Sequence, residues 1–297
     1  MPEAAATQHL HEVAPEPGVP KPDPMLTVDG VRKSFGGLIA VDVHHLEVQR
    51  GAITALIGPN GPGKSTFFNV LTGFDRADRG SWSFDGARVR LTTRPHTMAR
   101  RGLVRTFQLT KVLGKLTVLE NMQLAAAGQR GERLWNALFP PLWRREERAN
   151  EERALALLER FGMLHMQGEY AATLSGGQRK LLEMARALMV EPTMIMLDEP
   201  VAGVNPALQE HILDHVRSLR ESGMTVLFVE HDMDVVMGIS DWVVCMAEGR
   251  VQAEGPPRTI GQNEAVIDAY LGTHRGAPVE AAGEGAPGSE RTGDDAR

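Results

Sequence analysis

One nine-residue stretch limits the possible folds of this chain more than any other feature. The segment GPNGPGKST at residues 58–66 follows the apolar run ITALI, and a helical pattern continues over residues 63–72. A buried strand, a loop with the spacing G-x-x-x-x-G-K-[ST] and a helix, in this order, are typical of a phosphate-binding loop. A glycine-rich turn without a ligand is the competing interpretation, and the flanking strand and helix argue against it. We therefore predict an α/β fold that binds a nucleotide at this loop.

Residue types within the loop suit the phosphates of ATP. The glycines let backbone N–H groups turn inward, and the helix N-terminus adds its positive dipole end. We expect Lys64 to reach the β- and γ-phosphates and Ser65 to ligate Mg²⁺. Pro62 is unusual here because it has no backbone N–H to donate. The predicted ATP-binding residues of the loop are Gly58, Pro59, Asn60, Gly61, Pro62, Gly63, Lys64, Ser65 and Thr66.

Two carboxylates follow a later apolar strand. The segment MIMLDEP at 194–200 places Asp198 and Glu199 at the strand's carboxyl end. Beside a phosphate-binding loop, Asp198 can hold Mg²⁺, and Glu199 can orient and deprotonate the attacking water. Taken alone, an Asp-Glu pair is usually a solvated strand end. In combination with the loop, the pair predicts ATP hydrolysis with Glu199 as the general base.

A third motif, LSGGQ at 174–178, precedes the helical segment RKLLEMARAL. It offers a serine and two glycines at a helix N-terminus, as a phosphate site or a plain helix cap would. The order of loop, LSGGQ and LDEP resembles the ATP-binding subunits of ABC transporters over about residues 25–272. This resemblance implies a P-loop NTPase (RecA-like) α/β core with an antiparallel β subdomain and an inserted α-helical subdomain. It also implies a dimer in which Ser175 and Gly177 of one subunit cover the ATP of the other.

The same resemblance assigns roles to residues outside these motifs. Phe35 falls where the family stacks an aromatic ring on adenine, although a core phenylalanine at a strand end is the alternative. Gln108 resembles the glutamine that contacts Mg²⁺ and the attacking water, with a surface glutamine as the alternative. His231 resembles the histidine that contacts the γ-phosphate, and its position after a strand favours a ligand role. Asn205 stands where many relatives carry aspartate. The implied catalytic residues are Lys64, Gln108, Glu199 and His231, and the implied metal ligands are Ser65, Gln108 and Asp198.

The remaining patterns predict the organisation of the chain. MLTVDGVRKSF and AVDVHHLEVQRG have the β-branched residues and glycine boundaries of antiparallel strands. Strands alternate with helices in the C-terminal half, which predicts a parallel sheet with helices on both faces. We expect an ATP-binding domain over 25–273 with its helical subdomain at about 115–177. The segments 1–24 and 274–297 are rich in small residues and proline, so we expect them to be disordered.

Composition excludes several classes of protein. The net charge of −6 argues against nucleic acid as a partner, which requires a basic face. The single cysteine, Cys245, forms no intramolecular disulfide and fits a reducing cytoplasm. No window approaches the ~20 uninterrupted apolar residues of a membrane span. A role at a membrane therefore requires partner subunits.

The finer motifs narrow the resemblance. RTFQ, LDEPVAGVNP, VEHDMDVVMGISD and VIDAYLG are similar to the branched-chain amino acid transporter ATPases of bacteria, with urea and amide transporters as alternatives. This implies an import ATPase that is peripheral to the cytoplasmic face of the inner membrane. Its implied partners are a second ATP-binding subunit, identical or different, two integral membrane permease subunits and, indirectly, an extracytoplasmic solute-binding protein. Those chains, and not this one, select the substrate.

Two other functional classes make different predictions. A soluble ABC ATPase that acts on chromosomes carries a long coiled coil between the loop and LSGGQ, and one that acts on ribosomes usually carries two ATP domains in tandem. This sequence has neither feature. A regulatory protein without turnover would lack the catalytic carboxylate, and Glu199 is present.

Two further features receive structural interpretations. His211 and His215 have the spacing of a metal pair but no recognisable third ligand, so we expect a solvated helix face. Trp135, Phe139 and Trp143 are expected to pack within the helical insertion, or else to mark an interface.

Overall fold

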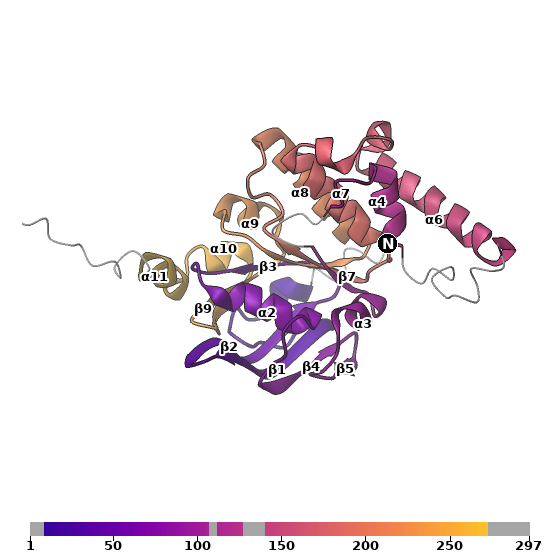
Figure 1. The fold of residues 1–297 in the computed structure, drawn as a ribbon. Helices are drawn as coiled ribbons and strands as arrows, with labels where there is room; N and C mark the ends of the chain where they lie inside the picture. Colours follow the sequence, from indigo (N-terminus) through magenta and orange to yellow (C-terminus); the bar gives the residue numbers. More distant parts are fainter. Residues whose placement is uncertain (1–8, 107–111, 127–139, 273–297) are drawn as a thin grey trace, which may run out of the picture.

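The computed structural model describes residues 9–106, 112–126 and 140–272. Two sheets and a group of helices make up this part of the chain (Figure 1). The larger sheet has six strands in the order β10-β9-β3-β8-β7-β6. Neighbouring strands are parallel except β10, which pairs antiparallel with β9. The strands are β3 (Ile53–Ile57), β6 (Leu103–Arg105), β7 (Met194–Asp198), β8 (Thr225–Val229), β9 (Trp242–Ala247) and β10 (Arg250–Gly255).

The smaller sheet is antiparallel, with the order β2-β1-β4-β5. Strands β1 and β2 pair along most of their length, which confirms the two antiparallel strands predicted from the sequence. Gly36, with φ of 58°, takes the left-handed conformation needed for the tight turn between them. The strands are β1 (Pro24–Phe35), β2 (Leu38–Gln49), β4 (Arg79–Phe84) and β5 (Ala87–Val89).

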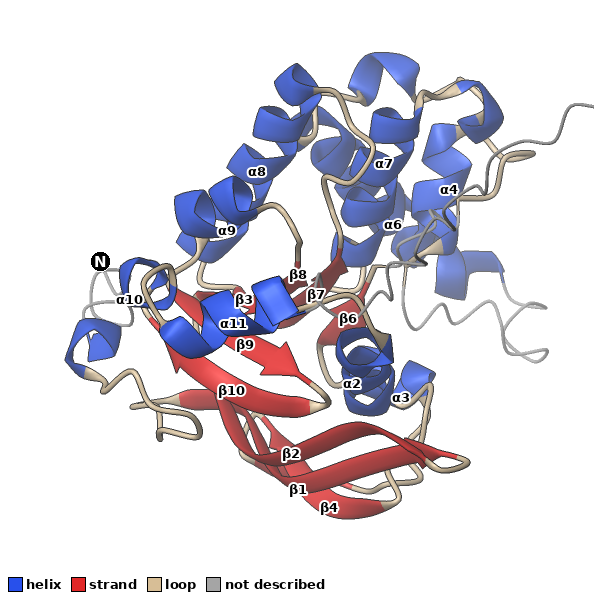
Figure 2. Cartoon of the chain, turned by 90° about the vertical axis from the view of Figure 1, so that its left-hand side faces the viewer, coloured by secondary structure: helices blue, strands red, loops and turns tan. Residues whose placement is uncertain are grey.

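Helices lie on both faces of the six-stranded sheet (Figure 2), as predicted. The α-helices are α2 (Pro62–Thr72), α3 (Pro95–Arg100), α4 (Val118–Leu124), α6 (Pro140–Arg160), α7 (Gly176–Leu188), α8 (Pro206–Glu221), α9 (Met233–Ile239), α10 (Pro257–Ile260) and α11 (Glu264–Gly272). Short 3-10 turns are η1 (His9–Glu12), η3 (Leu164–Met166) and η4 (Ala171–Thr173). None of the helices in the described ranges is long and apolar enough to cross a membrane.

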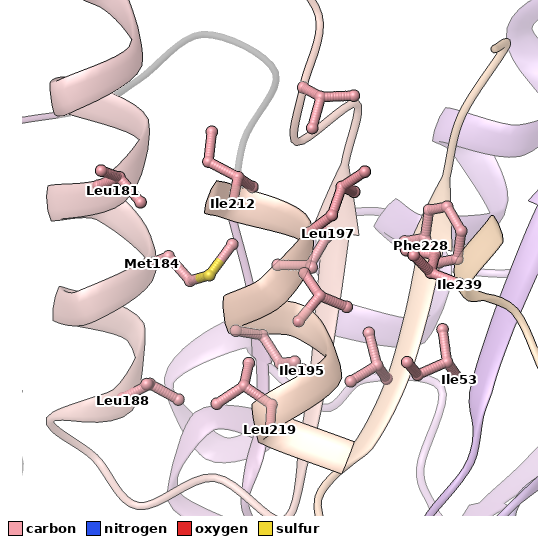
Figure 3. Packing of buried hydrophobic residues seen from close by; sticks show 14 of the residues in the cluster. Ile53, Leu181, Met184, Leu188, Ile195, Leu197, Ile212, Leu219, Phe228 and Ile239 are labelled. Carbon is pink, nitrogen blue, oxygen red and sulfur yellow. The ribbon is translucent and has the colours of Figure 1, made fainter. Parts of the chain in front are cut away.

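The six-stranded sheet separates two hydrophobic cores. Because alternate residues of a strand point to opposite faces, Ile53 of β3 enters one core and Leu56 enters the other. Helices α7 and α8 cover the first face, where Leu181 and Ile212 pack with strand residues such as Leu197 (Figure 3). The second face is covered by α2 and by the antiparallel sheet. All residues of β3, β7 and β8 are buried, as strands covered on both faces require.

The region predicted to be a helical subdomain contains α4, α6 and two 3-10 turns among its described residues. Its strand-like pairing in the described part is a single bridge between Thr117 and Tyr170. In α6, Ala154 and Leu158 join the same core as α7, while most of the charged residues that precede them are exposed. The limits at 115 and 177 stay a prediction.

The N-terminal segment differs from the prediction of disorder. Leu10 is only 2% exposed and joins the core beneath the antiparallel sheet. The Lys21 ammonium lies 2.9 Å from Glu254 Oε2 of β10, and both side chains are fully buried. Glu254 also accepts hydrogen bonds from the backbone N–H of Gly18 and from the indole of Trp242.

The prediction is therefore wrong for residues 9–24. A buried carboxylate needs partners, and this segment supplies an ammonium and N–H groups to Glu254, a pairing that a proline-rich composition does not reveal. Residues 1–8 and 273–297, including the whole predicted C-terminal tail at 274–297, lie outside the described residues.

Candidate functional site

The phosphate-binding loop connects β3 to α2 as predicted. Gly58 has φ of 141°, and a Cβ at this position would lie 1.9 Å from the carbonyl oxygen of Met246. Only glycine fits this close approach to the backbone. Pro62 occupies the first turn of α2, where the backbone nitrogen has no partner within the helix, so the proline does not disturb the helix itself.

Lys64 lies inside the loop. Its Nζ donates hydrogen bonds to the carbonyl oxygens of Gly58 at 2.8 Å and Pro59 at 2.7 Å. Burial lowers the pKa of Lys64, and the nearby Cys245, Glu199 and Asp198 oppose this shift. The neighbouring Ser65 is exposed and Thr66 is buried.

A cavity of about 260 Å³ opens beside this loop. One wall is the start of β2, and another is the turn between β9 and β10. The cavity is lined by Leu38, Ile39, Ala40, Pro59, Asn60, Gly61, Pro62, Gly63, Lys64, Met246, Ala247, Glu248 and Gly249. The sequence interpretation did not include the walls from β2 and the β9–β10 turn, because they are far from the loop in sequence.

Phe35 ends β1 and is 47% exposed, so it is not a core residue. The ammonium of Lys33 lies 4.9 Å from the centre of its ring. An exposed ring can stack on a base, whereas the alternative interpretation required burial. Phe35 does not line the cavity beside the loop, which Leu38 and Ile39 reach instead.

Asp198 is the last residue of β7 and is only 6% exposed. Its Oδ2 accepts a 2.6 Å hydrogen bond from Nη2 of Arg105 at the end of β6. Nη1 of Arg105 donates to Oδ1 of Asn69 in α2, at 2.5 Å. The arginine therefore ties Asp198 to the helix that follows the loop. Sequence reasoning missed Arg105, although it begins the RTFQ motif.

Glu199 adopts an uncommon backbone conformation, with φ of 49°. Its Oε1 lies 2.9 Å from Nε2 of His231, which follows β8. The two parallel strands β7 and β8 are neighbours, so the residues after their carboxyl ends meet. The structure thus brings together two residues that are 32 positions apart and that the sequence assigned to the same reaction.

Two further residues hold the segment after Glu199. The buried carboxylate of Glu230 accepts the backbone N–H of Val201 and that of His231, each at 3.2 Å. Burial raises the pKa of Glu230, and these two hydrogen bonds oppose the rise. Nζ of Lys180 in α7 donates to the carbonyl oxygens of Glu199 at 2.8 Å and Ala202 at 2.6 Å. The sequence interpretation gave a role to neither residue, although Glu230 directly precedes His231 in the segment VEHDM.

The LSGGQ motif forms the start of α7. Ser175 is its N-cap, with reciprocal side-chain to backbone hydrogen bonds to Gln178. A Cβ on Gly177 would lie 2.1 Å from the Leu208 side chain of α8, so this glycine also allows close helix packing within the chain. The buried residues of α7 and α2 belong to opposite faces of the sheet. Asn205 caps α8 by accepting the N–H of Leu208 at 3.0 Å.

Gln108 lies outside the described residues, as do Trp135 and Phe139. The metal interpretation therefore depends on Ser65 and Asp198. A hydroxyl and a carboxylate are hard oxygen donors, and Mg²⁺ in nucleotide sites is bound by one or two such groups plus phosphates. These two residues fit Mg²⁺. Within the described ranges, no group of three or more His, Cys, Asp and Glu side chains could hold a metal ion.

Of the histidine pair of α8, only His211 lies on a solvated face. His215 is buried and stacks on Phe161, with ring centres 4.2 Å apart, while His211 is exposed. Burial lowers the pKa of His215 to about 4, with smaller contributions from His211 and Arg160. The expectation of a solvated face is therefore wrong for His215, whose ring packs on Phe161 next to the end of α6. Cys245 is buried and forms no disulfide, and burial raises its pKa to about 11.

Comparisons with known proteins show which family the chain is similar to. A family model described as "ABC transporter" matches residues 41–202, and one described as "Branched-chain amino acid ATP-binding cassette transporter" matches residues 253–275. The chain is 42% identical over 248 residues to the probable branched-chain amino acid transport ATP-binding protein LivG of Archaeoglobus fulgidus. The matched region covers 84% of this chain and 95% of that protein. It is 40% identical to the high-affinity transport protein BraF of Pseudomonas aeruginosa, over 84% of this chain and 98% of that protein.

Solved structures show the same fold. One, described as the ADP conformation of an ATP-binding cassette of an ABC transporter, has a TM-score of 0.73 and 38% identity, over 84% of this chain and 99% of that one. A nucleotide-free cassette gives a TM-score of 0.72 and 37% identity, over 83% of this chain and 98% of that one.

Proposed function

Because this chain belongs to the ATP-binding subunits of ABC transporters and is homologous to the branched-chain amino acid import ATPases LivG and BraF, we propose that it powers the import of branched-chain amino acids. The chain is an ATP hydrolase of this family. Two observations in the comparisons support the cargo: the names of the relatives, and the match of residues 253–275 to a branched-chain amino acid model.

The site residues are assigned as follows. ATP binds to the loop from Gly58 to Thr66, with Lys64 on the β- and γ-phosphates and Phe35 on the base. Glu199 deprotonates the attacking water, and His231 orients Glu199 and contacts the γ-phosphate. The observation that carries this assignment is the 2.9 Å contact between His231 and Glu199 at the ends of neighbouring strands. A positioned base of this kind contributes about 10²- to 10⁴-fold to a rate.

Mg²⁺, when bound with ATP, neutralises phosphate charge. Ser65 and Asp198 would hold it, together with Gln108 by resemblance to the family. Arg105 holds the Asp198 carboxylate in a fixed direction at the end of β7, because its Nη2 donates to Asp198 Oδ2 at 2.6 Å and both side chains are only 6% exposed.

The assembly is proposed from the same resemblance. The ATP-binding domain spans 25–273 with its helical subdomain at 115–177, and residues 9–24 pack onto it. Two such subunits enclose ATP, with Ser175 and Gly177 of each facing the loop of the other. They act at the cytoplasmic face of the inner membrane with two permease subunits and, indirectly, a solute-binding protein.

Substitution of the base tests the chemistry. Glu199→Gln removes the proton acceptor but keeps the size of the side chain, so ATP binding should persist while hydrolysis falls by about 10²-fold or more. Undiminished turnover in this variant would remove Glu199 from its role.

Uptake by the assembled transporter tests the cargo. The chain would be reconstituted in liposomes with the permease and binding-protein products of the adjacent genes. ATP-dependent uptake of leucine, isoleucine and valine supports the proposal. Uptake of urea or an amide instead would replace the cargo and leave the ATPase assignment intact.

A further inference from the structure

Lys180 lies on α7, five residues after Ser175, and its side chain reaches the segment that begins with the proposed catalytic base. Its Nζ donates to the carbonyl oxygen of Glu199 at 2.8 Å and to that of Ala202 at 2.6 Å. An ammonium has three donors, so these contacts use two of them. The side chain is half-buried, and a small cavity of about 20 Å³ beside it is also lined by Asp198 and Glu199.

The backbone at Glu199 needs such support. A non-glycine residue with φ of 49° is in a sparsely populated conformation, which persists only where surrounding contacts determine it. The N–H of Glu199 donates to the carbonyl oxygen of Val229 at 3.0 Å, which anchors one side of the residue to β8. Lys180 anchors the other side, through the carbonyl oxygen.

The rest of the turn is anchored in the same way. Ala202 donates its N–H to the carbonyl oxygen of Glu199 at 3.3 Å and so closes a turn over residues 199–202. The carbonyl oxygens of the first and last residues of this turn both accept hydrogen bonds from Lys180. Glu230 accepts the N–H of Val201 in the same turn. One ammonium and one carboxylate thus hold the backbone of this turn, while the carboxylate of Glu199 contacts His231.

The helix that carries Lys180 is itself fixed in place. Leu181 and Met184, which follow Lys180 in α7, are buried in the core that also contains Leu197 of β7 (Figure 3). A displacement of α7 would therefore disturb its packing against β7 and would also move the Lys180 ammonium relative to the carbonyl oxygen of Glu199.

We propose that Lys180 is a positioning residue for ATP hydrolysis, which holds the backbone of Glu199 so that its carboxylate can act on the attacking water. This rests on the proposed role of Glu199. Because Ser175 caps α7, the contact also joins the helix that is proposed to face the second subunit's ATP to the hydrolytic carboxylate of this chain's own site. In this role Lys180 acts through the backbone of Glu199, whose carbonyl oxygen accepts its hydrogen bond.

Three variants of the full chain test the proposal. Lys180→Met keeps the aliphatic stem and removes the donors, Lys180→Arg restores two N–H donors, and Lys115→Met removes an exposed lysine as a matched control. Since misplacement of a catalytic group by about 1 Å can cost 10²-fold, we expect kcat of Lys180→Met to fall by about tenfold or more, with the Kd for ATP changed by less than about twofold. Lys180→Arg should regain most of kcat, and Lys115→Met should match the unchanged chain.

A double-mutant cycle separates this role from general destabilisation. In the Glu199→Gln background, adding Lys180→Met should cause no further loss in single-turnover hydrolysis, because the group that Lys180 positions is already gone. An unchanged kcat in Lys180→Met overturns the proposal, as does an equal loss in Lys180→Arg or a parallel weakening of ATP binding. If Glu199→Gln hydrolyses ATP at the unchanged rate, the proposed function has failed instead.

Discussion

Arg105 and Asp198 form an ion pair of 2.6 Å between the ends of β6 and β7, with both side chains only 6% exposed. The pair joins adjacent strands of the sheet, and through Asn69 it reaches the helix behind the phosphate-binding loop. These contacts fix the direction of the Asp198 carboxylate.

Removing the arginine should destabilise the protein. Arg105→Ala leaves a buried carboxylate without its cation, and breaking a buried pair costs about 3–5 kcal/mol. Urea unfolding monitored by circular dichroism measures the loss. Arg50→Ala is the matched control, because Arg50 pairs with Asp23 and Asp85 at the surface, where such pairs contribute about 0–1 kcal/mol. Equal losses in the two variants would contradict the importance of burial.

His231→Ala should lower the rate of ATP hydrolysis without abolishing ATP binding. The substitution removes the group that holds Glu199 Oε1, so we expect kcat to fall by about tenfold to a hundredfold. Steady-state ATPase assays and nucleotide titration measure the two effects. A loss of ATP affinity as large as the loss of kcat would show that His231 serves binding rather than chemistry.

Gly58→Ala should disrupt the loop. Its Cβ would lie 1.9 Å from the Met246 carbonyl oxygen, and both are backbone positions that cannot move independently. We expect the affinity for ATP to fall by at least about tenfold, which corresponds to 1.4 kcal/mol. Gly37→Ala is the control, since a Cβ there meets nothing within 4 Å. ATP binding as tight as in the unchanged chain would contradict this account of Gly58.

The pKa of His215 predicts a pH dependence of stability. The pKa is about 4 in the folded chain and ~6.5 in an unfolded one, so the unfolded state binds more protons between these values. Stability should therefore be highest above pH 6.5 and decrease as pH falls toward 4, by at most about 3 kcal/mol.

His215→Phe removes the titrating group and keeps a ring against Phe161. Urea unfolding at pH 5 and pH 7 should show a smaller difference for this variant than for the unchanged chain. The exposed His165, changed to glutamine, is the control. The same pH dependence in all three proteins would assign it to other groups.

ATPase activity should depend on protein concentration. If Ser175 and Gly177 complete the site of a second subunit, the rate per subunit should decrease on dilution as dimers dissociate. Assays over a dilution series, paired with light scattering, measure this. A constant rate in a proven monomer would refute the shared site.

The sequence by itself determined the main strands and helices, because periodicity and glycine spacing are local properties. The segment ITALIGPNGPGKST predicted β3, the loop and the start of α2, and MIMLDEP predicted β7 and its two carboxylates. Both depend on residues that are adjacent in the chain.

Only the tertiary structure decided which distant residues meet. Arg105, Glu230 and Lys180 reach the segment from Asp198 to Val201 from three separate parts of the chain, and no local pattern records such contacts. Composition likewise predicted disorder for residues 9–24, yet Lys21 is buried because Glu254, 233 positions later, pairs with it. The strand order brings these side chains together, and it is set by packing over the whole sheet rather than by any one segment.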